Sequence, residues 1–386
     1  MKRWHVVGIG AVSVAVLAVM VLVITATNKA PAPIESPRFQ PLSASFASAE
    51  EGWVLGAIEP CDSGRPCQRI EHTTDGGRTW QALPSTIPQG AWTIRFATAA
   101  EGWVTAQGVL WWTSDGGADW EIADWAGVTL GRNTSLSGDS VRFVNGSRSG
   151  RLELSIGRMG GAADEASSFR TDGDYLADPV VESVTRDDTT WVWTYGEQRG
   201  PGGAATPVSA GAKIVGEQWF PWRTPCNAAD EYLSALQAPT TDRVVALCAP
   251  RATASGYRQP RLLVSADGGE TFAVRDIPAA TLTTLLASAQ DTIVLGMDGA
   301  IHASFDGGRQ WTRTYSPPES GGYTNFGSLG RTDHDNGPGF VTASTGFTFR
   351  TTRFPADNIH AYRSEKTLLV TRDGGHSWSP VDFGSR

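Results

Sequence analysis

The chain has 386 residues, of which 40 are acidic and 32 are basic, so its formal net charge at pH 7 is -8. Because nucleic-acid-binding surfaces need an excess of lysine and arginine, this balance argues against a nucleic-acid partner. The length would hold two or three average domains, although a single repeat domain also reaches this size.

The N-terminus predicts a membrane-spanning helix. Residues 1–5 include Lys2 and Arg3, whereas Val6–Thr27 contains no charged residue. A helix of that length rises about 33 Å, enough to cross a bilayer. The preceding positive charge places residues 1–5 in the cytoplasm and the rest of the chain outside. An uncleaved signal-anchor is favoured because the apolar run is long, while a cleaved signal peptide, which would release the protein, stays open.

A proline-rich segment, residues 28–41, follows and is expected to be an extended spacer that holds residues 42–386 away from the membrane. Within residues 42–386 an eight-residue pattern recurs at Thr73–Trp80, Thr113–Trp120, Ser265–Phe272, Ser304–Trp311 and Thr371–Trp378. Each copy has a Ser or Thr, then Asp-Gly-Gly, and a closing aromatic residue; we call these copies the Asp-Gly-Gly turns.

The composition of these turns has a physical basis. Glycine adopts the positive φ angles that a tight turn needs, and the Asp carboxylate accepts hydrogen bonds from N–H groups inside the turn. The closing aromatic residue is expected to pack against the neighbouring repeat. The residues expected to have these structural roles are Asp75, Gly77, Trp80, Asp115, Gly117, Trp120, Asp267, Gly269, Phe272, Asp306, Gly308, Trp311, Asp373, Gly375 and Trp378.

The pattern resembles the Asp-box, or BNR repeat, of β-propellers. In sialidases, xyloglucanases, sortilin-type receptors and photosystem II assembly-factor-like proteins, this box lies between the third and fourth strands of a blade. The segments Phe46–Val54 and Phe96–Val104 share F-x(4)-E-G-W-V and are similar to repeats of the assembly-factor family. The resemblance implies that the aspartates are structural rather than catalytic.

The spacing of the turns predicts the number of blades. Asp115 follows Asp75 by 40 residues and Asp306 follows Asp267 by 39, which are usual blade lengths. The longer interval to Asp373 predicts an insertion in Ser316–Tyr323 or Thr351–Glu365, and Ser168–Asp174 resembles a degenerate turn. We therefore expect an all-β fold, a single propeller with seven four-stranded blades after the transmembrane helix, with six or eight blades also compatible.

The four cysteines predict disulfides. Cys61, Cys67, Cys226 and Cys248 allow three pairings, of which Cys61–Cys67 with Cys226–Cys248 is favoured because shorter loops cost less entropy to close. Neither spacing resembles a zinc site. The pattern is typical of structural disulfides in an oxidising compartment.

No catalytic, cofactor-binding or metal-binding residue is expected from the sequence. Asp333–Asn336 offers oxygen ligands for a cation, but a polar turn is the favoured interpretation. Several arginines could line a mouth for an anionic ligand, namely Arg258, Arg261, Arg331, Arg350 and Arg353. The N-terminal apolar segment, the resemblance to Asp-box propellers and the lack of a catalytic motif together favour a monomeric, membrane-anchored, extracytoplasmic scaffold. Such a scaffold would bind a protein or a cell-envelope glycan without catalysis. The alternative is a sialidase-like exo-glycosidase, although the expected Tyr–Glu pair and arginine pattern do not match.

Overall fold

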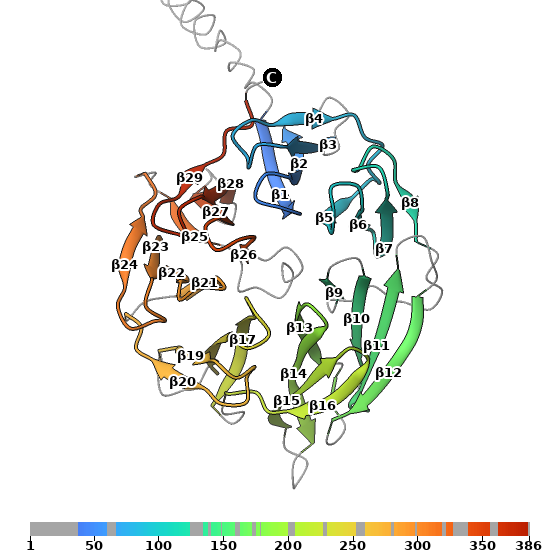
Figure 1. Cartoon of the computed structure of the whole chain (residues 1–386), viewed down its shortest axis with the longest axis vertical. Coiled ribbons are helices and arrows are strands. Elements are labelled where there is room, and N and C mark those ends of the chain that lie inside the picture. The colour runs from blue at the N-terminus through green and yellow to red at the C-terminus, as the bar shows by residue number, and fades with distance from the viewer. Residues whose placement is uncertain are drawn as a thin grey trace, which may run out of the picture.

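The computed structural model describes residues 38–384 with short gaps, which are residues 60–66, 124–133, 138–139, 148, 159–162, 172–174, 178, 200–204, 227–229, 252–258, 279–281, 298, 319–321, 327–338 and 356–361. The described residues form antiparallel sheets that follow one another in chain order around a ring (Figure 1). This radial arrangement is a β-propeller.

The sheets are numbered here from the N-terminus. The first contains β1 (Arg38–Phe46), β2 (Gly52–Glu59), β3 (Cys67–Thr73) and β4 (Gln81–Leu83), and the second contains β5 (Ala91–Phe96), β6 (Gly102–Ala106), β7 (Val109–Thr113) and β8 (Glu121–Ile122). The third contains β9 (Thr134–Ser137), β10 (Ser140–Gly146), β11 (Arg151–Arg158) and β12 (Ala163–Arg170), and the fourth contains β13 (Val180–Arg186), β14 (Thr189–Arg199), β15 (Ala205–Val215) and β16 (Gln218–Trp222). The fifth contains β17 (Glu231–Gln237), β18 (Val244–Pro250), β19 (Arg261–Ser265) and β20 (Ala273–Arg275), and the sixth contains β21 (Leu282–Ala287), β22 (Ile293–Met297), β23 (Ala300–Ser304) and β24 (Thr312–Tyr315). The last contains β25 (Tyr323–Phe326), β26 (Gly339–Phe340), β27 (Gly346–Pro355), β28 (Tyr362–Thr371) and β29 (Ser379–Pro380).

The prediction of seven four-stranded blades is corrected by this topology. Within the described residues six sheets, not seven, have four strands, and the last sheet has five. The fifth strand arises because β25 and β26 both pair with β27, with residues 327–338 between them. The extra residues lie partly between β25 and β26, outside both segments expected to hold the insertion. They lie partly in the long strands β27 and β28, which extend into Thr351–Glu365, one of the two expected segments.

Two further expectations concern the start and the middle of the chain. The described part of the chain contains strands only, and none of its elements is a helix long and apolar enough to cross a bilayer. Val6–Thr27, for which the transmembrane helix was predicted, lies outside the described residues. The prediction of a degenerate turn at Ser168–Asp174 is wrong, because Phe169 and Arg170 belong to β12, the fourth strand of its sheet.

Burial follows the radial position of each strand. The second strands β6 and β22 are buried along their whole length, because neighbouring sheets cover both of their faces. The outermost strands β4 and β8 are largely exposed. Apolar side chains fill the spaces between adjacent sheets; Trp53 of the first sheet, for example, stacks on Phe96 of the second with ring centroids 3.7 Å apart.

The ring closes between the first and last sheets without exchange of strands, since each sheet is built from consecutive strands. Side chains make the closure: Lys366 Nζ donates to the carbonyl of Leu42 at 2.8 Å, and Phe46 packs on Phe347 at 5.1 Å between centroids. The C-terminal end lies beside the first sheet (Figure 1), where Phe383 contacts Trp80 with ring centroids 5.2 Å apart. The closing interface is therefore an apolar core flanked by polar contacts.

Candidate functional site

The Asp-Gly-Gly turns hold their own aspartates. In the first turn, the Asp75 carboxylate accepts the backbone N–H groups of Arg78 and Thr79, each at 2.9 Å, and the hydroxyl of Thr79 at 2.6 Å. Thr73 Oγ1 donates to the same carboxylate at 2.8 Å and accepts the N–H of Gly77 at 2.9 Å. Corresponding bonds surround Asp115, Asp267, Asp306 and Asp373.

These hydrogen bonds keep the aspartates ionised. The hydroxyl and N–H of Thr79 hold the pKa of Asp75 far below its usual value, and the same groups of Thr271 lower the pKa of Asp267 to about 2. A carboxylate with a pKa this low does not hold a proton near neutral pH and is unsuited to general acid catalysis. The local bonding therefore gives these aspartates a structural role.

All five turns lie at the same end of their sheets. In each, the N–H of the first glycine donates to a backbone carbonyl in the connection between the first and second strands, at 2.7–3.0 Å; the acceptors are Glu50, Ala100, Asp242, Asp291 and Ser344. The second glycines, Gly77, Gly117, Gly269, Gly308 and Gly375, all have positive φ. Among the closing residues Trp80, Trp120 and Trp378 are buried, whereas Phe272 and Trp311 are half-buried. We call this end of the ring the turn face.

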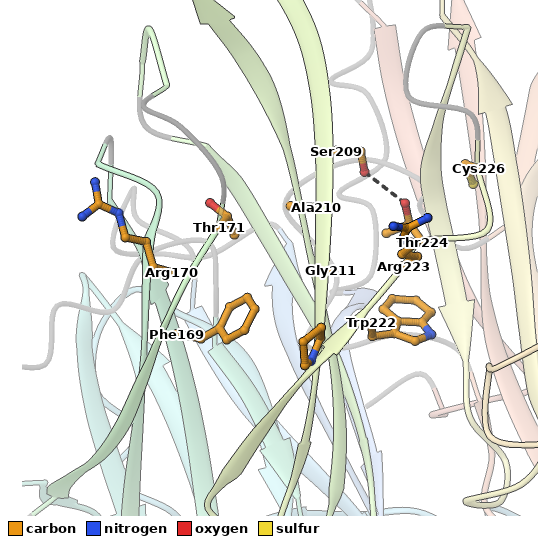
Figure 2. Close-up of a pocket in the computed structure, with 11 residues that line it drawn as sticks. Phe169, Arg170, Thr171, Ser209, Ala210, Gly211, Trp222, Arg223, Thr224 and Cys226 are labelled. Carbon is orange, nitrogen blue, oxygen red and sulfur yellow. Dashed lines mark hydrogen bonds between the residues drawn. The ribbon is translucent and has the colours of Figure 1, made fainter.

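The other end of each sheet carries the connection between its second and third strands. In the fourth sheet β14 and β15 are long, and they pair along Thr189–Arg199 and Ala205–Val215. Near this end a groove of about 530 Å³ lies between the third and fourth sheets (Figure 2). It is lined by Phe169, Arg170, Thr171, Ser209, Ala210, Gly211, Pro221, Trp222, Arg223, Thr224 and Cys226.

The walls of the groove are fixed by contacts on both sides of β15. On one side Thr171 is buried and donates its hydroxyl to the carbonyl of Gly150 at 2.9 Å. On the other side Trp222 is buried and donates Nε1–H to the carbonyl of Gly269, in the Asp-Gly-Gly turn of the fifth sheet, at 2.8 Å. The walls are thus anchored to their own sheet or to the next one.

A disulfide secures the segment after β16. Cys226 is linked to Cys248, which is fully buried in β18 of the fifth sheet, and this confirms one of the two predicted pairs. Cys67 begins β3, but Cys61 lies outside the described residues, so the second pair stays a prediction. β16 ends at Trp222, shortly before the bridged Cys226, and beyond that point β15 continues with β14 as its only partner strand among the described residues.

The groove is basic and rich in hydroxyl groups. Arg170 and Arg223 are both exposed, and the guanidinium of Arg170 points away from Ser209 in Figure 2. The hydroxyls of Ser209 and Thr224 are 3.4 Å apart (Figure 2). Its described lining contains no aspartate, glutamate or histidine, and the described residues as a whole hold no cluster of metal-ligating side chains. This chemistry suits the binding of a carboxylate or of a main-chain segment.

The three described arginines among those expected at a mouth lie in the fifth sheet (Arg261) and in the last sheet (Arg350 and Arg353). Arg261 forms two hydrogen bonds with the carboxylate of Glu231, at 2.7 and 2.6 Å, and these bonds raise its pKa. Arg350, in the last sheet, donates to the hydroxyls of Tyr315 and Thr367 at 2.9 and 3.0 Å. Arg353 is exposed on β27. Arg258, Arg331 and the cation loop Asp333–Asn336 lie outside the described residues.

Sequence reasoning did not find the groove. The sequence places Phe169 and Arg170 in an expected degenerate turn, and no motif surrounds Arg223. The available signal was the sequence Trp222–Cys226, in which an arginine and a threonine precede a cysteine expected to be bridged to Cys248. That signal predicts a fixed segment at a sheet edge, but not the neighbouring wall.

Known structures support the fold. Similar solved structures include YCF48 bound to D1 peptide (20% identity, 67% of this chain and 75% of that chain covered, TM-score 0.41). The β-propeller domain of the Trilobed protease from Pyrococcus furiosus, whose topology is called open velcro, is 7% identical, with 91% and 97% covered and a TM-score of 0.56. The BP39L lectin from Burkholderia pseudomallei is 12% identical, with 89% and 99% covered and a TM-score of 0.50.

These similarities define the class of protein and no more. At such identities the second and third structures show a shared fold alone, and the score of the first is too low to support an argument. No protein-family model matches the chain, and no curated protein matches it. The chain is thus similar to β-propellers of different function, so its own function has to be argued from its site.

Proposed function

We propose that this protein is a non-catalytic binding or assembly scaffold. It presents the groove between the third and fourth sheets to a protein or glycan of the cell envelope. The observation that carries the proposal is the groove itself: anchored walls, two exposed arginines and no acidic residue in its described lining, in a chain with a net charge of -8. A basic site on an acidic protein favours an anionic partner and disfavours non-specific contacts.

The chemistry of the site supports binding rather than catalysis. Glycoside hydrolysis needs two carboxylates across a cleft or a nucleophile with a partner carboxylate. The described lining of the groove offers neither, and the recurring aspartates are engaged inside their own turns. We infer that these turns are Asp-boxes in the structural sense that their sequence suggests.

The proposal includes a location. Residues 6–27 act as a signal-anchor, residues 28–41 as a spacer, and residues 42–386 as a monomeric propeller on the outer side of the cell membrane. The disulfide between Cys226 and Cys248 supports this location, because such bonds persist in oxidising compartments. If the N-terminal segment is cleaved instead, the same propeller is secreted.

A panel of fluorogenic glycosides, sialosides included, tests the absence of catalysis. We expect no turnover above the buffer rate by full-length protein that shows a cooperative thermal unfolding transition. Turnover that disappears when one carboxylate is replaced by its amide would make the protein a membrane-anchored glycosidase and would contradict the proposal.

A further inference from the structure

One edge of β15 is open where it enters the groove. β15 pairs with β14 from Ala205 to Val215, but with β16 only from Gly211 to Val215. The segment Ala205–Ala210 therefore has a partner strand on one side only. Ser209 and Ala210 from this segment line the groove. Unpaired strand edges present main-chain donors and acceptors that another strand can use.

The register shows which main-chain groups point to the open side. β15 and β16 are joined through Gly216 and Glu217, so Val215 and Gln218 form the closing pair of a two-residue hairpin. The closing pair of such a hairpin exchanges hydrogen bonds, and bonded pairs then alternate along an antiparallel ladder. The odd-numbered residues of β15 consequently point their N–H and C=O groups toward the β16 side.

Beyond the end of β16 the same alternation holds, so Ala205, Pro207 and Ser209 also point their main-chain groups toward the β16 side. Pro207 has no N–H to lose, and an open edge is the place in a sheet where proline is tolerated. Ser209 has both groups, and its N–H has no backbone partner on this side among the described residues. The open edge thus presents the carbonyls of Pro207 and Ser209 and the N–H of Ser209 to the groove.

Charge selects the kind of strand that fits here. Arg223 lies just after the end of β16, is exposed, and forms no ion pair or hydrogen bond with any described residue. A strand added beside Ser209 would take the place of Thr224, whose hydroxyl lies 3.4 Å from that of Ser209. It would pass close to Arg223, because Arg223 directly follows Trp222, which is paired with Gly211. A carboxylate on that strand would complement the arginine, whereas a lysine would be repelled.

We propose that an extended, acidic segment of a protein partner adds to the open edge of β15 and places a carboxylate against Arg223. The inference rests on the proposed function and makes it more specific, since it names a peptide strand as the ligand of the groove. Main-chain bonds to Ser209 and Pro207 supply affinity without regard to sequence, and Arg223 supplies the preference for acidic side chains.

The test uses full-length protein in detergent and three labelled probes. One is a hexapeptide of alternating glutamate and valine, the second replaces glutamate by lysine, and the third is the acidic hexapeptide with every backbone amide N-methylated. We expect the acidic peptide to bind, and both other probes to bind at least about tenfold more weakly, as measured by fluorescence anisotropy.

Variants assign the binding to the edge. R223E is expected to weaken the acidic peptide about tenfold, whereas R353E, at an exposed arginine of the last sheet, leaves it unchanged. S209P removes the outward N–H and is expected to weaken binding severalfold, which corresponds to one hydrogen bond. If S209P fails to fold, slower hydrogen exchange of the Ser209 amide in the wild-type complex provides the same information.

Each outcome decides a different point. Equal binding of the N-methylated peptide would overturn strand addition while leaving a groove that binds acidic ligands. Absence of acidic-peptide binding, or equal binding of the lysine peptide, would also overturn the inference without affecting the proposed scaffold function. The scaffold function fails separately, through carboxylate-dependent turnover in the glycoside panel.

Discussion

Replacement of Trp53 should show how strongly neighbouring sheets depend on one another. Trp53 is fully buried in β2; its indole stacks between Phe96 and His72, with centroids 3.7 and 4.8 Å away. Its Nε1–H donates to the carbonyl of Gly116, in the Asp-Gly-Gly turn of the second sheet, at 3.0 Å. The single side chain thus joins the core of one sheet to the turn of the next.

The expected cost follows from these contacts. Truncation of a buried aromatic residue to alanine costs about 3–5 kcal/mol, so W53A should lower the free energy of unfolding by about 4 kcal/mol. W53F keeps most of the apolar contact and loses one hydrogen bond and part of the ring. Its expected cost is about 1–2 kcal/mol. The difference between the two variants measures the stacking contribution.

Urea unfolding followed by circular dichroism provides the assay, with the midpoint shift read at an unchanged denaturant slope. The matched control is W92A, because Trp92 in β5 is 44% exposed and should lose markedly less than the fully buried Trp53. A W53A variant within about 1 kcal/mol of wild type, or no less stable than W92A, would refute the view that this residue joins the two sheets.

Three further predictions concern the disulfide, the aspartates and a turn glycine. Replacing Cys226 and Cys248 by serine should cost about 3 kcal/mol, as expected for a loop of 22 residues; a loss below about 1 kcal/mol in urea unfolding would contradict this. The folded-state pKa of Asp267 is lowered to about 2, so its contribution is complete above about pH 4 and is lost as pH falls towards 2. Wild type should therefore lose stability more steeply than D267N in that window, and parallel curves would count against the argument. Gly77 has φ +78° and a Cβ there would lie 3.1 Å from the Trp80 ring, so G77A should cost about 1–3 kcal/mol in the same assay and more than G108A, whose φ is +79° but whose Cβ meets nothing.

The sequence predicts much of this fold because its turns carry local information. Asp-Gly-Gly between apolar runs needs positive φ and a self-bonded carboxylate wherever it occurs, so its recurrence predicts five hairpins. The resemblance to the Asp-box placed these hairpins between third and fourth strands, where they lie. The short loop between Cys226 and Cys248 predicted their pairing, because short loops cost less entropy to close. Features that depend on one segment and its own neighbours were thus accessible from sequence.

Features that depend on segments far apart in the chain could not be predicted from the sequence. The split of the innermost strand into β25 and β26 depends on pairing with β27, and the polar turn expected at Asp333–Asn336 does not reveal that pairing. The groove is formed by residues near 170, 210 and 223 that meet only when the third and fourth sheets pack. Spacing counts residues along the chain, and it does not report which strand ends before its neighbour.

Site-specific photo-crosslinking tests the central claim, that the groove binds an envelope partner, most directly. A photoreactive benzoylphenylalanine replaces exposed Pro221 at the groove in one full-length variant, which keeps Arg223, and exposed Arg353 in another, and both are irradiated in the membranes of the producing cells. The account predicts a discrete adduct from position 221 that is absent from position 353 and is suppressed by an excess of the acidic hexapeptide. Equal adducts from both positions, or no adduct from position 221 in folded protein, would contradict it.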